Sequence, residues 1–148
     1  MGVTVIDPVS IRAAVDISDV IEPVARALVA YSQGAANSGP VGLLALPHSG
    51  EAHLKSGYIH GGRYFVSKVA TMCPHNRQLG RATSNGVMMV FDAETGEPVT
   101  LLHDLKYLTD LRTAAVGALA AIVTECTITV EREVTDEPEE IKTDAKPL

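Results

Sequence analysis

Lys68 is the first residue whose type and position could do chemistry. It stands between Val66 and Val69 in the apolar run RYFVSKVATM, which has the composition of a β-strand. An ammonium group there must point to solvent, pair with an acid, or face a polar pocket, because an unpaired buried charge is costly. Exposed lysines are common on edge strands, so the strand alone does not decide among these.

Arg112 is a second candidate, because we expect it near the start of a helix. Thr109 or Asp110 can cap a helix through TDLRTAAVGALAAIV, which would put Arg112 in the first turn. A cation there is disfavoured by the helix dipole unless an anion shares the site. Free N–H groups at a helix start attract carboxylates and phosphates, so Arg112 predicts an anion clamp. A salt bridge to Asp104 or Asp110 is the alternative.

Other chemistries have weaker support in the sequence. Cys73 and His75 are separated by one residue, but without a second ligand cluster they do not predict a zinc site, and we expect no bound metal. The five histidines are scattered, and no spacing of Ser, His and Asp indicates a catalytic triad.

These residues need elements to position them, and the sequence predicts an α+β fold. Val3 to Ile6 alternates like a short strand, and Asp7 with Pro8 starts a short helix over residues 9 to 15. A longer helix is expected from Ser18 to Gln33, and AANSGP after it reads as a loop.

A run of strands follows the two helices. The stretches VGLLAL, EAHLKSGYI and RYFVSKVATM are broken by HSG and HGG, which predicts antiparallel hairpins. Residues 73 to 85 read as a long loop, and GVMMVFD and VTLLHD around AETGEP form the clearest hairpin. The predicted architecture is therefore N-terminal helices packed on an antiparallel hairpin sheet, with a closing Ala-rich helix.

Composition bounds the size and setting of the protein. The 148 residues are 46% hydrophobic and 20% charged, with a net charge of -6, and fit one domain over residues 1–130. Residues 131–148 are rich in acidic residues and predict a disordered tail. The scattered Lys and Arg argue against nucleic-acid binding. No uncharged apolar run is long enough to span a membrane, and we expect a soluble, cytoplasmic protein.

Three motifs stand in a distinctive order: the lysine inside FVSKVAT, the hairpin turn FDAETGEP, and the helix start TDLRTAA. With these motifs, the chain resembles the ornithine cyclodeaminase and mu-crystallin family over roughly residues 3 to 121. The resemblance implies a substrate-binding and dimerisation part built on an antiparallel sheet, followed in the family by a Rossmann domain that binds NAD(P). It implies that Lys68 and Arg112 contact substrate and that Thr83 lies near the cofactor.

Two departures from the family pattern limit what the resemblance implies. The family places a further Arg after the first long helix, but none occurs here between Arg26 and Arg63. His53 and Lys55, two apart on one face of a strand, could substitute, so Lys55 joins the predicted substrate contacts. No G-x-G-x-x-G motif occurs, and the family's catalytic Asp belongs to the Rossmann domain, so we expect no catalytic residue in this chain.

We therefore expect a truncated family member that binds a small amino acid or carboxylate and forms a homodimer. Alone, it should bind no NAD(P) and should not catalyse a reaction, because hydride transfer needs a positioned nicotinamide. The alternative is the substrate half of an NAD-linked amino-acid deaminase or imine reductase, completed by a Rossmann-domain partner chain.

Overall fold

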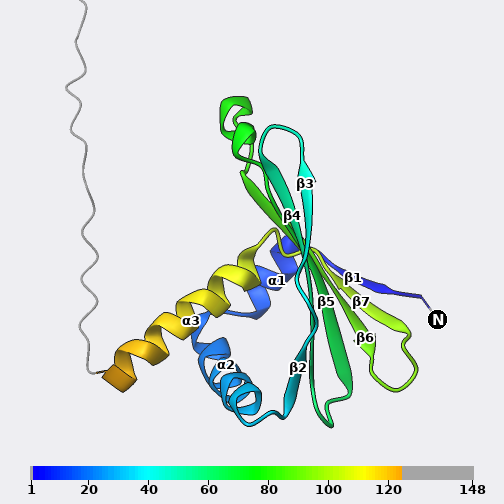
Figure 1. The fold of residues 1–148 in the computed structure, drawn as a ribbon, viewed down its shortest axis with the longest axis vertical. Helices are drawn as coiled ribbons and strands as arrows, with labels where there is room; N and C mark the ends of the chain where they lie inside the picture. Colours follow the sequence, from blue (N-terminus) through cyan, green and yellow to red (C-terminus); the bar gives the residue numbers. More distant parts are fainter. Residues whose placement is uncertain (1, 125–148) are drawn as a thin grey trace, which may run out of the picture.

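The computed structural model describes residues 2–124, which form one mixed sheet with three α-helices against one of its faces (Figure 1). The α+β prediction is confirmed. The acidic tail expected at residues 131–148 lies outside the described residues. The elements in chain order are β1 (Thr4–Ile6), α1 (Pro8–Ala14), α2 (Ile17–Ser32), β2 (Ala36–Ser38), β3 (Gly42–Leu46), β4 (Gly50–Ile59), β5 (Tyr64–Met72), η1 (Pro74–Leu79), β6 (Ser84–Asp92), β7 (Pro98–Leu102) and α3 (Tyr107–Thr124).

The predicted hairpins form the centre of the sheet, whose strand order is β1-β7-β6-β5-β4-β2, with β3 also pairing with β4. Strands β4, β5, β6 and β7 pair antiparallel in succession. The sequence did not predict how β1 pairs, and it lies parallel to β7 at the edge. The loop expected at residues 35–40 is wrong in part, because β2 pairs there with the end of β4 and takes up its exposed backbone groups.

The first helix starts beside Asp7 and Pro8 as the sequence predicts, and the second starts at Ile17, one residue before the predicted Ser18. Asp7 caps α1, where its carboxylate accepts hydrogen bonds from the amides of Val9 and Ser10. Asp16 caps α2 in a capping box with Asp19, and Gly34 follows the helix with a φ of 71°. Pro23 lies inside the first turns of α2 without ending it.

The third helix starts earlier than expected. Helix α3 begins at Tyr107, so Thr109 and Asp110 lie inside its first turn and do not cap it. The turn before it brings Leu105 and Lys106 to φ values of 47° and 75°, and the Tyr107 amide donates to the Asp104 carbonyl. Positive φ at two residues other than glycine is strained, so the surroundings must hold this turn in place.

Asp104 supplies that restraint. Its side chain is 1% exposed, and its Oδ2 accepts a hydrogen bond from the Leu108 amide at 3.1 Å. Nearby, Tyr107 donates its hydroxyl to the Val15 carbonyl at 2.9 Å and lies under the guanidinium of Arg12. The start of α3 is thus fixed to both the sheet end and α1.

Residues pointing away from the helices form the open face of the sheet, defined here by Val5, Leu54, Val69, Phe65 and Phe91. Helices α1, α2 and α3 all lie on the other side (Figure 1). Side chains of the open face stay accessible: Val5 is 64% exposed and Leu54 is 45% exposed. Within residues 2–124, few hydrophobic residues are fully buried: Ile11, Ala52 and Ala115.

We predict that Asp104→Ala lowers the free energy of unfolding by about 2 to 3 kcal/mol, because it removes a buried hydrogen bond and a restraint on a strained turn. The matched control is Asp16→Ala, which removes an exposed cap and should cost about 1 kcal/mol. Urea unfolding of the three proteins measures both. Equal losses in the two variants would contradict the role of Asp104.

Candidate anion-binding site

A cavity of about 230 Å³ lies between the helix-covered face of the sheet and the first turns of α3. Two of the three predicted substrate contacts, Lys55 and Lys68, reach it from neighbouring strands, and the third, Arg112, reaches it from α3. Its lining is His53, Lys55, Lys68, Ala70, Thr71, Met72, Ser84, Asn85, Lys106, Thr109 and Arg112. No Asp or Glu lines it, so the cavity has a surplus of positive charge.

Lys68 lies in the wall of this cavity. Its Nζ donates a hydrogen bond to Thr109 Oγ1 at 3.0 Å, which links β5 to the first turn of α3. Burial lowers the pKa of Lys68 below its ordinary value, and the positive charges of Arg112 and then Lys55 lower it further, while Asp104 opposes them. Of the three positions open to Lys68, the structure therefore shows a polar pocket.

Lys55 lies directly opposite Lys68 in the antiparallel pairing of β4 and β5. Residues opposite each other in such a pair point to the same face, so both ammonium groups reach the cavity. His53 lies two residues earlier on that face, as predicted, but its Nε2 is 2.9 Å from Glu51 Oε2. Lys55 is therefore better placed than His53 to meet an anion.

The other cations of the cavity differ in how their charge is matched. Lys106 pairs with Asp110 at 2.9 Å. Arg112 pairs with neither Asp104 nor Asp110, and within residues 2–124 neither it nor Lys55 forms an ion pair. The uncompensated charges are therefore those of Lys55, Lys68 and Arg112.

Arg112 lines the cavity beside Lys68, but the prediction that it lies in the first turn of its helix is wrong. Because α3 begins at Tyr107, Arg112 lies in its second turn rather than beside free N–H groups. The Asp104 carboxylate already accepts from the Leu108 amide at this helix start. An anion at Arg112 would be held by side-chain charge, not by the helix terminus.

The predicted cofactor contact, Thr83, lies elsewhere. It lines an adjoining cavity of about 330 Å³ with Met72, Pro74, Arg77 and Ser84, and Ser84 also lines the cationic cavity. Its carbonyl accepts a hydrogen bond from the Cys73 amide at 2.7 Å. Its role near a cofactor stays a prediction.

Metal binding has no structural support in the described part of the chain. His75 stacks on His48 with ring centroids 4.6 Å apart, and Cys73 is a free thiol. Residues 2–124 contain no group of three or more His, Cys, Asp or Glu that could hold a metal ion. None of their helices is long and apolar enough to cross a membrane.

Thr109 and Lys106 line the cavity, although the sequence predicted neither as a site residue. Thr109 was expected to cap a helix, but its hydroxyl holds Lys68, and Lys106 was not singled out at all. A hydroxyl one turn before Arg112 was a usable signal, because residues three apart lie on the same helix face. Lysine is not a residue type that indicates a positive φ, so the turn at Lys106 could not be predicted from the sequence.

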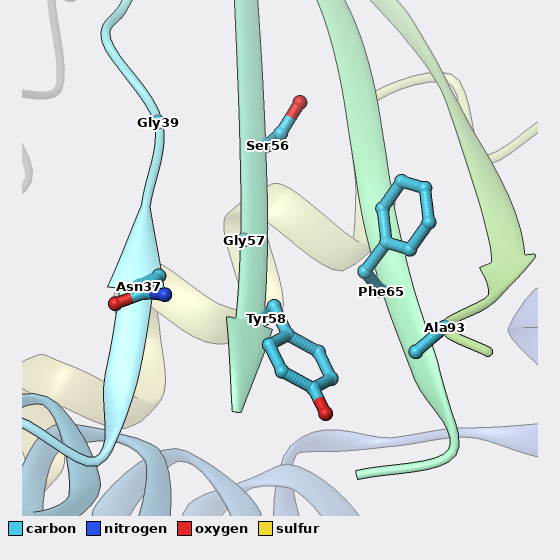
Figure 2. Close-up of a pocket in the computed structure, with 7 residues that line it drawn as sticks. All are labelled: Asn37, Gly39, Ser56, Gly57, Tyr58, Phe65 and Ala93. Carbon is cyan, nitrogen blue, oxygen red and sulfur yellow. The ribbon is translucent and has the colours of Figure 1, made fainter. Parts of the chain in front are cut away.

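A second cavity, of about 280 Å³, opens on the other face of the sheet (Figure 2). Phe65 and Tyr58 project from neighbouring strands there, and the helices lie behind the sheet in this view. Its lining is Asn37, Gly39, Ser56, Gly57, Tyr58, Phe65 and Ala93, without a charged side chain. It suits apolar contact and does not share the chemistry of the cationic cavity.

The chain belongs to the ornithine cyclodeaminase/mu-crystallin family, whose model matches residues 3–123. A Delta(1)-pyrroline-2-carboxylate reductase of Bacillus cereus is 34% identical over 112 residues, which are 74% of this chain and 34% of the reductase. A cyclodeaminase of Sinorhizobium fredii, uncharacterized, is 41% identical over 83 residues, 55% of this chain and 25% of that protein. The chain thus spans a quarter to a third of these relatives.

Solved structures show the same fold. An archaeal alanine dehydrogenase dimer with bound NAD superposes with a TM-score of 0.76 at 24% identity, covering 82% of this chain and 37% of that one. The Delta(1)-pyrroline-2-carboxylate reductase of Thermococcus litoralis, in complex with NADH and L-proline, gives 0.75 at 22% identity, covering 80% and 36%.

Residues 2–124 do not offer a fit for such a cofactor's pyrophosphate. Nucleotide-binding folds place it on free amides at a helix start after a glycine-rich turn. Here Asp7, Asp16 and Asp104 place carboxylates on the first amides of α1, α2 and α3. A phosphate at any of these starts would meet a like charge.

We predict that Lys68→Met changes stability in a pH-dependent way. Because the folded-state pKa of Lys68 lies below 10.5, the unfolded chain binds more protons in the interval between the two values. The charged Lys68 side chain therefore lowers the free energy of unfolding by its full amount at neutral pH, and this loss disappears as the pH rises through the interval. At neutral pH the variant should be more stable by a few tenths to about 1 kcal/mol, after allowing for solvent screening.

Urea unfolding of both proteins over a pH series tests this expectation. The difference between them isolates Lys68, because other titrating groups are common to both. A difference that stays constant from neutral to alkaline pH would contradict it.

Proposed function

We propose that this chain is the substrate-binding and dimerisation module of an NAD(P)-dependent enzyme acting on small amino or imino acids. The nucleotide-binding domain that such chemistry needs comes, in this proposal, from outside these 148 residues. Alone, the chain binds the substrate carboxylate and is not catalytic. Family membership and the NAD-linked relatives support the reaction class.

One observation carries the proposal: Lys55, Lys68 and Arg112 line a single cavity that no carboxylate side chain lines. Desolvation and like-charge repulsion on Lys68 make this arrangement unfavourable without an anion. Groups held at a cost to stability mark functional sites more often than structural ones. A small carboxylate would relieve the repulsion through charge-assisted hydrogen bonds.

Each residue has a distinct task in this proposal. Arg112 offers a planar guanidinium that can hold a carboxylate through two parallel bonds. The ammonium group of Lys68 is held in position by its hydrogen bond to Thr109 and supplies a second positive charge in the same cavity. A bound nicotinamide would supply the hydride chemistry, and the residues described here bind and orient the substrate.

We predict weak binding of small carboxylates by the isolated chain. With two charge-assisted contacts and no covering domain to exclude water, dissociation constants for pyruvate and proline should be on the order of millimolar. Arg112→Ala should weaken binding about tenfold. Chemical-shift titration measures both, and Arg26→Ala, an exposed residue paired with Glu22, is the matched control. Shifts that do not cluster around Lys68 and Arg112 would overturn the proposal.

The dimerisation part of the proposal rests on the open face of the sheet. A contiguous apolar surface on one side of a sheet marks an interaction site in a soluble protein. A second copy is the simplest occupant, since a two-fold interface needs only one self-complementary patch. The Phe65 and Phe91 rings, stacked 4.7 Å apart on this face, offer a broad surface for it.

We expect sedimentation at micromolar concentration to show a dimer. Val69→Glu should convert it to a monomer, because a charge would be buried in the apolar interface. Val29→Glu changes an exposed residue of α2, which does not lie on the open face of the sheet, and should leave the dimer intact. A wild-type monomer, or dissociation by the α2 variant alone, would contradict the assignment.

A further inference from the structure

The cationic cavity carries more positive charge than one carboxylate can match. Lys68 and Arg112 suffice to hold a monocarboxylate, as proposed above. Lys55 is then left without a partner among residues 2–124, on the same face and directly opposite Lys68. Only a second negative charge on the ligand could then pair with Lys55.

We propose that Lys55 selects the side chain of the ligand, favouring an acidic group and disfavouring a cationic one. The favoured substrate class is an amino or imino dicarboxylate. This inference rests on the proposed function, because it assumes that the first carboxylate lies at Lys68 and Arg112.

The register of the sheet gives the geometry. Lys55 and Lys68 lie on adjacent strands, about 4.8 Å apart in the direction of strand pairing. A ligand whose first carboxylate sits between Lys68 and Arg112 can extend across this spacing toward Lys55. The second carboxylate of a short dicarboxylate would then lie close to the ammonium group of Lys55.

Neighbouring groups do not cancel the charge of Lys55. Glu51 is the nearest acid along the same face of β4, but its carboxylate is held by His53 at 2.9 Å. Asp110 on α3 is held by Lys106. Asp104 is buried and bonded to the Leu108 amide, and it follows β7, which is separated from β4 by β6 and β5 in the sheet. A ligand carboxylate therefore has no protein competitor for Lys55 among the described residues.

The expected selectivity is modest, because Lys55 is exposed and solvent screens its charge. Aspartate and asparagine make a matched pair of probes, since they differ in side-chain charge and hardly in shape. The full 148-residue chain should bind aspartate about five-fold more tightly than asparagine, the equivalent of about 1 kcal/mol. Ornithine should bind more weakly than asparagine.

The variants test whether Lys55 is the cause. Lys55→Met keeps the apolar stem and should bring the ratio of the aspartate and asparagine affinities close to one. Lys55→Glu should reverse the order and favour ornithine. Arg26→Met is the control, because Arg26 is an exposed cation outside the cavity that is paired with Glu22, and it should leave the ratio near five.

The outcomes separate this inference from the proposed function. Equal binding of aspartate and asparagine to the wild-type chain, with both lost in Arg112→Ala, would overturn the role of Lys55 and keep the carboxylate site. A preference for aspartate that persists in Lys55→Met would overturn it as well. No Arg112-dependent binding of any probe would remove the proposed function and this inference together. Circular dichroism of each variant confirms that the comparison is between folded proteins.

Discussion

The rest of the site depends on the hydrogen bond that the buried carboxylate of Asp104 accepts from the Leu108 amide. This bond closes the strained turn between β7 and α3, and so sets where the helix begins. The start of the helix sets the position of Thr109, whose hydroxyl holds Lys68. A shift of one residue in α3 would turn its residues by about 100° around the helix axis and move Thr109 and Arg112 off the cavity. A single buried acid thereby couples the end of the sheet to the spacing of the cations.

Each face of the sheet carries one energetically unfavourable feature. On the helix side, desolvation and repulsion lower the pKa of Lys68, so the site is less stable without an anion than with one. On the other side, residues such as Val5 and Leu54 remain exposed. Both features fit the proposal that the chain completes its packing and its charge balance by binding a partner and an anion. Residues 2–124 alone bury few hydrophobic side chains fully, as expected of such a module.

A protein can hold an anion through free amides at a helix start or through side-chain cations, and residues 2–124 offer only the second. Helix starts attract anions through free amides, but Asp7, Asp16 and Asp104 occupy the helix starts with carboxylates of the chain itself. The proposed anion site therefore rests on side-chain cations alone. Side-chain cations can be exchanged one at a time, so the charge preference of the cavity can change without altering the backbone.

The sequence by itself determined the local elements, because their signals are local: the hairpin strands alternate between glycine-rich turns, and Asp7 and Asp16 cap helices through their own amides. It also placed His53 and Lys55 on one face of a strand, and the family motifs singled out Lys68 and Arg112. Only the tertiary structure decided the edge pairing of β2, the parallel pairing of β1, and the true start of α3. The two strand pairings depend on unpaired backbone groups of β7 and β4, which are distant in the sequence. The start of α3 depends on the burial of Asp104. The bond between Lys68 and Thr109 joins residues 41 positions apart, and no local pattern could have specified it.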